Sequence, residues 1–256
     1  MHRYLFIGGL HRSGTSILAR LIAAHPQVSA IECAPVPENE GCYLQGAIPH
    51  TALDGAPMRF ATDPRQHLVE GCRHDTHVVR DRMEADWAPW FETSKPWRLE
   101  KSPVNLTRMR LYQQLFPLSQ FVVILRHPEV VAQAVAKWLP EDAPEALVDH
   151  WLRAHAQLES DLPYLHSVCV IRYEDLCANP AGVIAGLHGF MGLAAQPLAA
   201  QVRDRNAEYA AAPLLPENAA ARWGYGPAHD VRPWMPHVTH TLRACREAAL
   251  DRMGFR

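Results

Sequence analysis

The sequence predicts an α/β fold in which helices flank a central parallel sheet in three layers. Three short apolar segments, at residues 4–7, 121–125 and 168–171, have the length and composition of buried strands. Segments with helical periodicity separate them, and this alternation is typical of a parallel sheet covered on both faces. The 256 residues suit a single domain, which we expect to span residues 1–256.

The helices can be placed in chain order. After the first strand and a Gly-rich turn, Ile17, Leu18, Leu21 and Ile22 have the spacing of one helical face, and His25-Pro26 ends that helix. Further helices are expected at 129–138, 144–160, 180–191 and 241–253. The region 32–64 is rich in Pro and Gly, so we expect loops and short helices there. Residues 65–97 mix helical stretches with tryptophans, and the region 195–240 is irregular and rich in Ala and Pro.

Composition excludes several classes of protein. The chain has 25 Lys and Arg against 27 Asp and Glu, a net charge of -2, and 48% hydrophobic residues. These values are typical of an ordinary globular protein, and they argue against disorder or a dedicated nucleic-acid binder. A local basic site for a small anion remains compatible with them.

The lack of a recognisable secretion signal and the spacing of the cysteines predict a cytoplasmic protein. The first apolar run, residues 4–7, is too short for a secretion signal, and no run approaches the roughly 18 apolar residues of a membrane span. The six cysteines are scattered without a C-x-x-C pair, so we expect reduced thiols. We therefore expect no membrane partner and no nucleic acid; a homodimer remains open.

The sharpest local signal is the segment Gly9-Leu10-His11-Arg12-Ser13-Gly14-Thr15-Ser16 between the first strand and the first helix. Glycines let the backbone curl, a helix N-terminus attracts anions, and Arg and hydroxyl side chains donate hydrogen bonds to oxyanions. The loop is P-loop-like, but Thr15 stands where a Walker A loop has Lys. The second strand ends in Arg126 instead of the Mg²⁺-binding Asp of a Walker B strand. The alternative is a Gly-rich turn without a ligand.

Three segments carry a resemblance to sulfotransferases that use 3′-phosphoadenosine 5′-phosphosulfate (PAPS). The loop GGLHRSGTSIL resembles the family's 5′-phosphosulfate loop, FVVILRHP at 121–128 its 3′-phosphate segment, and IRYEDL at 171–176 the strand that follows. Order and spacing match over roughly residues 4–190. The R-S-G-T loop is similar to that of bacterial and Golgi-type members.

The resemblance implies cofactor-binding roles. The residues implied to hold the 5′-phosphosulfate are Arg12, Ser13, Gly14, Thr15 and Ser16. Arg126 is implied to bind the 3′-phosphate. The family usually has a Ser eight residues after this Arg, where this chain has Ala134. Arg222, in ARWGYG, resembles the basic residue of the family's C-terminal cofactor loop.

The resemblance also implies catalytic residues. Lys101, in E-K-S-P, would stabilise charge beside the sulfuryl group, and Pro103 stands where cytosolic members have their catalytic His. Members without that His use a Glu downstream of the loop. Glu32 and Glu40 fall at two positions used in this way, and Glu38 lies close by. We favour Glu40, with Glu32 as the second candidate.

These residues predict a sulfotransferase that acts on a hydroxyl or amine of a small-molecule acceptor, whose identity depends on regions 33–100 and 195–240. A kinase-like phosphotransferase and a non-catalytic nucleotide-binding protein are the alternatives. Cys72, His74 and His77 lie close together in sequence, but no fourth ligand is visible, so we expect no metal.

Overall fold

The computed structural model describes four stretches of the chain, residues 2–54, 57–198, 201–210 and 213–255. The few other residues, some of which fall within the predicted acceptor-site regions 33–100 and 195–240, lie outside the described ranges. None of the helices in the described part of the chain combines the length and apolarity that a bilayer crossing requires.

The strands form one six-stranded sheet in the order β2-β3-β1-β4-β5-β6. Their bounds are β1 Arg3–Gly8, β2 Val28–Ala30, β3 Trp97–Lys101, β4 Gln120–Leu125, β5 Val168–Arg172 and β6 His237–Thr239. The first five strands pair in parallel, and β6 runs antiparallel to β5. The predicted central parallel sheet is confirmed, with an antiparallel strand at one edge.

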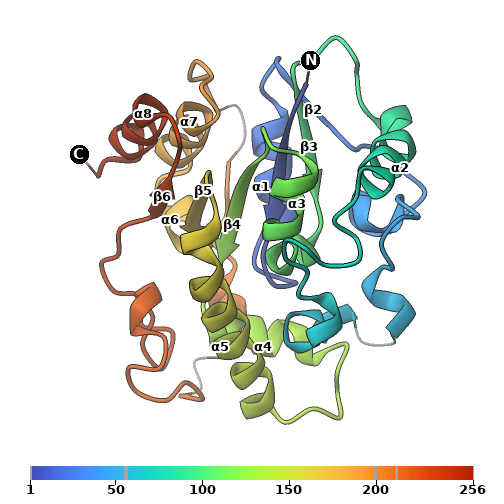
Figure 1. The fold of residues 1–256 in the computed structure, drawn as a ribbon. Coiled ribbons are helices and arrows are strands. Elements are labelled where there is room, and N and C mark those ends of the chain that lie inside the picture. The colour runs from blue at the N-terminus through green and yellow to red at the C-terminus, as the bar shows by residue number, and fades with distance from the viewer. Residues whose placement is uncertain (1, 55–56, 199–200, 211–212, 256) are drawn as a thin grey trace.

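Helices cover both faces of this sheet, as Figure 1 shows. Their bounds are α1 Thr15–Ala23, α2 His77–Trp87, α3 Met109–Leu115, α4 Pro128–Ala136, α5 Pro144–Asp161, α6 Tyr173–Ala178, α7 Pro180–Phe190 and α8 Arg243–Met253. Apolar side chains of α1, α6, α7 and α8 pack in one core layer, and those of α2, α3, α4 and α5 in the other. The three-layer architecture follows.

Strand β1 shows how the sequence produces two cores. Tyr4 and Phe6 point into the layer with α2 and α3, whereas Leu5 and Ile7 point into the layer with α1 and α7. All four are buried, because side chains alternate across a strand and both faces of this sheet are covered. A continuous apolar run is therefore the signature of β1, and the same holds for β4 and β5.

The carboxyl ends of the parallel strands meet at one edge of the sheet. Ile7 of β1 pairs with Lys101 of β3, and Gly8 of β1 pairs with Val123 of β4. The loop after β1, the residues after β3 and Arg126 after β4 are thereby brought together. Ligands of open α/β sheets bind at this edge.

Candidate active site

The loop between β1 and α1 packs tightly through left-handed residues. Gly9, Arg12 and Gly14 have φ angles of 152°, 69° and 101°. A Cβ at Gly9 would lie 2.6 Å from the carbonyl oxygen of Ile124, and a Cβ at Gly14 would lie 2.8 Å from Cδ2 of Tyr173. Because only glycine avoids these contacts, the two glycines let the loop lie directly against β4 and α6.

The first turn of α1 is open to an anion. Gly14 is the N-cap and has no side chain to accept hydrogen bonds from the helix N–H groups. Ser13 is fully buried, and its Oγ has no hydrogen-bond partner among the described residues. Buried hydroxyls are normally hydrogen-bonded. An unsatisfied hydroxyl beside an open helix N-terminus indicates room for an oxyanion ligand.

A cavity of about 440 Å³ opens over this turn, and we call it the loop cavity. Its walls come from the loop, the start of α1, the residues after β2 and β4, and the segment 201–205. Lining residues that the sequence singled out are Arg12, Gly14, Thr15, Ser16, Glu38, Glu40 and Arg126. The structure thus brings together residues from three of the predicted segments.

Arg126 enters the loop cavity with one nitrogen unsatisfied. Its side chain is buried; Nε donates to Asn206 Oδ1 at 2.8 Å and Nη1 donates to the carbonyl oxygen of Arg12 at 3.0 Å. Nη2 has no partner in the described part of the chain. The guanidinium lies 4.4 Å from the ring centroid of Tyr173. It is a fixed cation with a donor still free for an anion.

Three arginines of the loop cavity, Arg20 of α1 and two from the segment after residue 200, were not predicted from the sequence. Arg203 and Arg205 line the loop cavity, and Arg205 is paired with Glu208. Tyr173 holds their backbone: its hydroxyl donates to the carbonyl oxygen of Arg203 at 3.0 Å and accepts from the N–H of Arg205 at 3.3 Å. The local signal is only an R-D-R triplet in an irregular region, which specifies no position in the fold.

Arg222 does not reach the loop cavity. It lies in the short turn Ala221–Trp223, where its Nε donates to Glu159 Oε1 of α5 at 2.9 Å. More than half of its side chain is exposed to solvent. Its predicted cofactor contact is therefore not supported by the geometry. Ala134 is buried within α4 and offers no hydroxyl, as the sequence indicated.

Glu40 and Lys101 form a buried pair beside the loop. Lys101 Nζ lies 3.3 Å from Glu40 Oε1 and donates to the carbonyl oxygen of Glu38 at 2.8 Å. The side chain of Lys101 is 5% exposed and that of Glu40 is 8% exposed. Burial raises the pKa of Glu40 to about 7, although Lys101 acts in the opposite direction. A carboxyl with this pKa can exchange a proton near neutral pH.

The backbone next to Glu40 is held by a network that sequence analysis did not predict. Gly41 N–H donates to Glu100 Oε1 at 2.9 Å, and Trp87 Nε1 donates to the carbonyl oxygen of Gly41 at 2.9 Å. Ser102 Oγ accepts from the N–H of Cys42 at 3.1 Å. Glu100 is fully buried, which raises its pKa. The residues flanking Lys101 therefore fix the segment that carries Glu40.

Glu32 and Glu38, unlike Glu40, have exposed side chains. Glu32 is exposed and lines a neighbouring cavity, away from the loop cavity. Glu38 is also exposed, lines both cavities, and accepts a hydrogen bond from Ser16 Oγ at 3.1 Å. Of the three carboxylates, Glu40 alone combines burial, contact with Lys101 and a place in the loop cavity within the described structure.

His11 and Trp138 also line the loop cavity. Burial lowers the pKa of His11 to about 4, so this imidazole is neutral at pH 7. The Arg12 guanidinium lies 5.3 Å from the Trp138 ring centroid. No group of three His, Cys, Asp or Glu side chains in the described ranges is arranged to hold a metal ion, and Cys72, His74 and His77 do not form one.

Comparisons with solved structures support the architecture. The structure is similar to a sulfotransferase from Alicyclobacillus acidocaldarius, with a TM-score of 0.50 and 18% identity over 81% of this chain and 89% of that one. It is also similar to sulfotransferase STF9 from Mycobacterium avium, with a TM-score of 0.52 and 11% identity over 78% of this chain and 65% of that one. A comparison with curated proteins gave no significant match.

A model of the sulfotransferase family matches residues 5–197. The match covers the loop, the residues after β3 and β4, and all of β5. Together with the fold, it shows that this chain belongs to the sulfotransferase family.

Proposed function

We propose that the protein transfers a sulfuryl group from PAPS to a hydroxyl or amine of a small-molecule acceptor, with Glu40 as the general base. The observation that carries this proposal is that Glu40 lines the loop cavity together with the anion-binding loop and is paired with Lys101. A base with a pKa of about 7 lies beside a cation and an open helix N-terminus. Sulfuryl transfer needs these three elements.

The described residues fit PAPS. Ser13 Oγ and Arg126 Nη2 are buried polar atoms without partners, and the ligand's oxyanions would satisfy them. We assign the 5′-phosphosulfate to the loop residues Arg12, Ser13, Gly14, Thr15 and Ser16. We assign the 3′-phosphate to Arg126, with Arg203 and Arg205 in place of the hydroxyl that Ala134 lacks. Arg222 is left out of this set.

Each catalytic residue then has a definite task. When bound, PAPS supplies a sulfuryl group on a phosphate leaving group. Glu40 accepts the proton of the acceptor's hydroxyl or amine as that atom bonds to sulfur. Lys101 and the Ser16 hydroxyl stabilise negative charge on the oxygens around sulfur, by analogy with phosphoryl transfer. Glu32 remains the second candidate for the base.

Calorimetry with two nucleotides tests the cofactor. We expect adenosine 3′,5′-bisphosphate to bind and ATP with Mg²⁺ to bind far more weakly, because the loop has Thr15 where a Walker A loop has Lys. The opposite preference would favour a kinase-like phosphotransferase. Transfer of radiolabelled sulfate from PAPS to a panel of phenols, alcohols and amines tests the activity. Nucleotide binding without any transfer would favour a non-catalytic nucleotide-binding protein.

The other expectations are part of the same proposal. The acceptor would be a small molecule, and neither a nucleic acid nor a membrane is expected as a partner. A cytoplasmic location, a single domain over residues 1–256 and the absence of a metal requirement stay predictions, and a homodimer stays open. The region 195–240 lies almost wholly beyond the family match, yet residues 201–205 line the loop cavity.

A further inference from the structure

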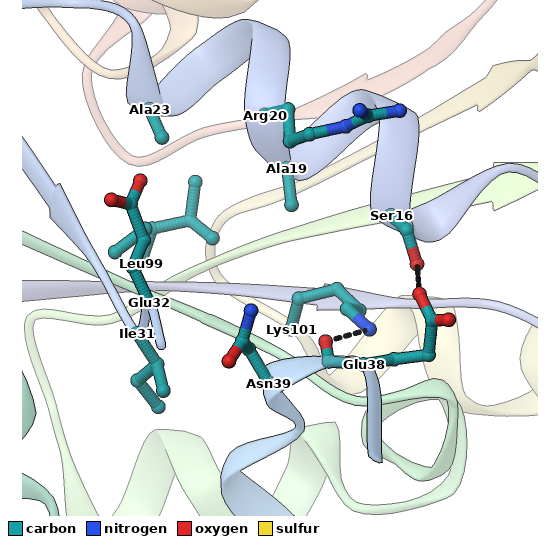
Figure 2. Close-up of a pocket in the computed structure, with 11 residues that line it drawn as sticks. Ser16, Ala19, Arg20, Ala23, Ile31, Glu32, Glu38, Asn39, Leu99 and Lys101 are labelled. Atoms are coloured by element: carbon teal, nitrogen blue, oxygen red, sulfur yellow. Dashed lines mark hydrogen bonds between the residues drawn. The ribbon is translucent and has the colours of Figure 1, made fainter. Parts of the chain in front are cut away.

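A second cavity, of about 420 Å³, lies beside α1, and we call it the α1 cavity. Figure 2 shows it between α1 and the segment that follows β2. Its floor is apolar and includes Ala19 and Ala23 of α1 and Leu99 of β3, while charged side chains stand around its edge. An apolar floor with a few polar groups is typical of small-molecule sites, and the volume lies within their usual range.

The α1 cavity adjoins the loop cavity on the side of Lys101. Ser16, Arg20 and Glu38 line both cavities. Arg126 follows β4 and Lys101 ends β3, with β1 between these strands. A nucleotide with its 3′-phosphate on Arg126 and its 5′ end on the loop after β1 directs the sulfuryl group toward Lys101. In-line displacement brings the acceptor from the side opposite the leaving phosphate. The α1 cavity, which Lys101 lines, is the space that adjoins the loop cavity beyond Ser16 and Glu38.

Glu38 stands between the two cavities. Its Oε2 accepts from Ser16 Oγ at 3.1 Å, at the helix N-terminus that attracts anions. Its backbone is left-handed, with φ 52° and ψ 22°, and Lys101 Nζ holds its carbonyl oxygen at 2.8 Å. The main chain is thus anchored while the carboxylate is exposed. A phosphosulfate at Ser16 would repel this carboxylate and compete with it for the same hydroxyl.

We propose that the α1 cavity receives the acceptor, and that the Glu38 carboxylate closes it off from the loop cavity until the phosphosulfate displaces that carboxylate from Ser16. The inference rests on the proposed function. The nucleophile of the acceptor then lies next to Lys101, whose Nζ is 3.3 Å from Glu40. As the nucleophile bonds to sulfur, the bond from sulfur to the leaving phosphate breaks and the proton passes to Glu40.

The charges at the two ends of the α1 cavity indicate the class of acceptor. Figure 2 shows the Arg20 guanidinium extending toward Ser16, whereas the Glu32 carboxylate stands at the opposite end, near Ala23. Glu32 forms no hydrogen bond or ion pair with any other described residue. The cavity therefore suits a small acceptor with an apolar body and a cationic group at the end far from its nucleophile.

The role of Glu38 is tested by PAPS binding in the absence of acceptor. Glu38→Gln removes the charge and keeps the shape, so we expect PAPS to bind the variant about tenfold more tightly than wild type at low salt, and the gain to shrink as salt screens the repulsion. Glu141→Gln is the matched control, because it removes an exposed carboxylate that lines neither cavity. Equal affinities of Glu38→Gln and wild type would overturn the displacement. Failure of wild type to bind PAPS would instead count against the proposed function.

The acceptor site is tested by filling the cavity. Ala23→Leu places a larger side chain inside it, and Ala24→Leu places the same side chain on the exposed next residue. The probes are tyramine and 4-hydroxyphenylacetate, phenols of opposite charge, titrated into the complex with adenosine 3′,5′-bisphosphate. We expect wild type to prefer tyramine, Ala23→Leu to bind it at least about tenfold more weakly, and Ala24→Leu to bind it normally. Equal effects of the two variants, no preference between the probes, or no tyramine binding to wild type would overturn the assignment.

Discussion

The raised pKa of Glu40 makes stability and activity depend on this residue in opposite directions. Its carboxyl has a pKa of about 7 in the folded protein, against an ordinary value of 4.5. At about 1.4 kcal/mol per unit, ionisation of Glu40 costs the folded state about 3 kcal/mol. The folded pKa lies above the unfolded one, so this cost is absent below pH 4.5, grows between pH 4.5 and about 7, and is complete above that pH.

Glu40→Gln removes the ionisation while keeping the shape of the side chain. At pH 8 we expect its free energy of unfolding in urea to exceed that of wild type by up to about 3 kcal/mol, and the difference to disappear near pH 4.5. Sulfuryl transfer should fall by about 10²-fold or more, because the variant has no base. The rate of wild type should rise with pH through about 7, as Glu40 loses its proton.

Glu141→Gln serves as the control for both measurements, since this exposed carboxylate lines neither cavity. This control should have the same free energy of unfolding as wild type at pH 8 and near pH 4.5, and its transfer rate should rise at the same pH. If Glu40→Gln were less stable than wild type by the same amount at both pH values, burial would not raise the pKa of Glu40. If the variant kept its transfer rate while Glu32→Gln lost it, Glu32 would be the base.

Three further changes test other parts of the structure. Arg126→Gln should weaken binding of adenosine 3′,5′-bisphosphate by about 10- to 100-fold in calorimetry, the size of a charge-assisted hydrogen bond, whereas Arg222→Gln should leave it unchanged. Gly14→Ala should lower the free energy of unfolding by more than Gly71→Ala does in urea denaturation; both glycines have positive φ, but only at Gly14 would the new Cβ meet a neighbour, at 2.8 Å. Equal losses would mean that backbone strain alone matters. Burial lowers the pKa of His155 to about 3, so stability should decline as pH falls from 6.5 toward 3, and His155→Leu should flatten that decline; an unchanged slope would contradict the lowered pKa.

The sequence predicted strands that are apolar throughout and missed the others. Strands β1, β4 and β5 lie within a residue or two of the predicted segments. Strand β3 was missed although all five of its residues are buried, because Arg98, Glu100 and Lys101 are charged. Their partners come from distant segments: Glu100 accepts from the N–H of Gly41, and Arg98 donates to the Tyr4 hydroxyl. A burial pattern that depends on such partners cannot be found by hydropathy.

The same reasoning explains which site residues could be found. The loop after β1 is a local motif, and the structure places it at a strand–helix junction as expected. Arg203 and Arg205 owe their place to the Tyr173 hydroxyl, about 30 residues earlier in the chain, so no local pattern indicates it. Arg222 shows the converse: a short local similarity pointed to the cofactor, while the fold directs this side chain toward α5.

Two carboxylates that follow β5, Glu174 and Asp175, help to hold the C-terminal segment. Arg172 forms a double hydrogen bond with Asp175 and donates to the carbonyl oxygen of Arg232. Glu174 accepts from the Asn206 amide and the Tyr225 hydroxyl. The R-Y-E-D segment therefore ties Asn206, Tyr225 and Arg232 to the edge of the sheet, and both of its carboxylates are used in that scaffold.

This arrangement explains how a chain of net charge -2 can offer an anion site. Glu129 is fully buried, and its carboxylate accepts hydrogen bonds from the backbone N–H groups of Leu215 and His229 instead of pointing at the loop. Arg12 and Arg126 form no ion pair with a carboxylate in the described stretches. Glu38, the carboxylate at Ser16, is exposed and can be displaced. The positive potential at the loop cavity thus depends on which carboxylates lie close to it. Because salt screens distant charges, charge reversal at a remote surface should alter nucleotide affinity far less than Glu38→Gln does.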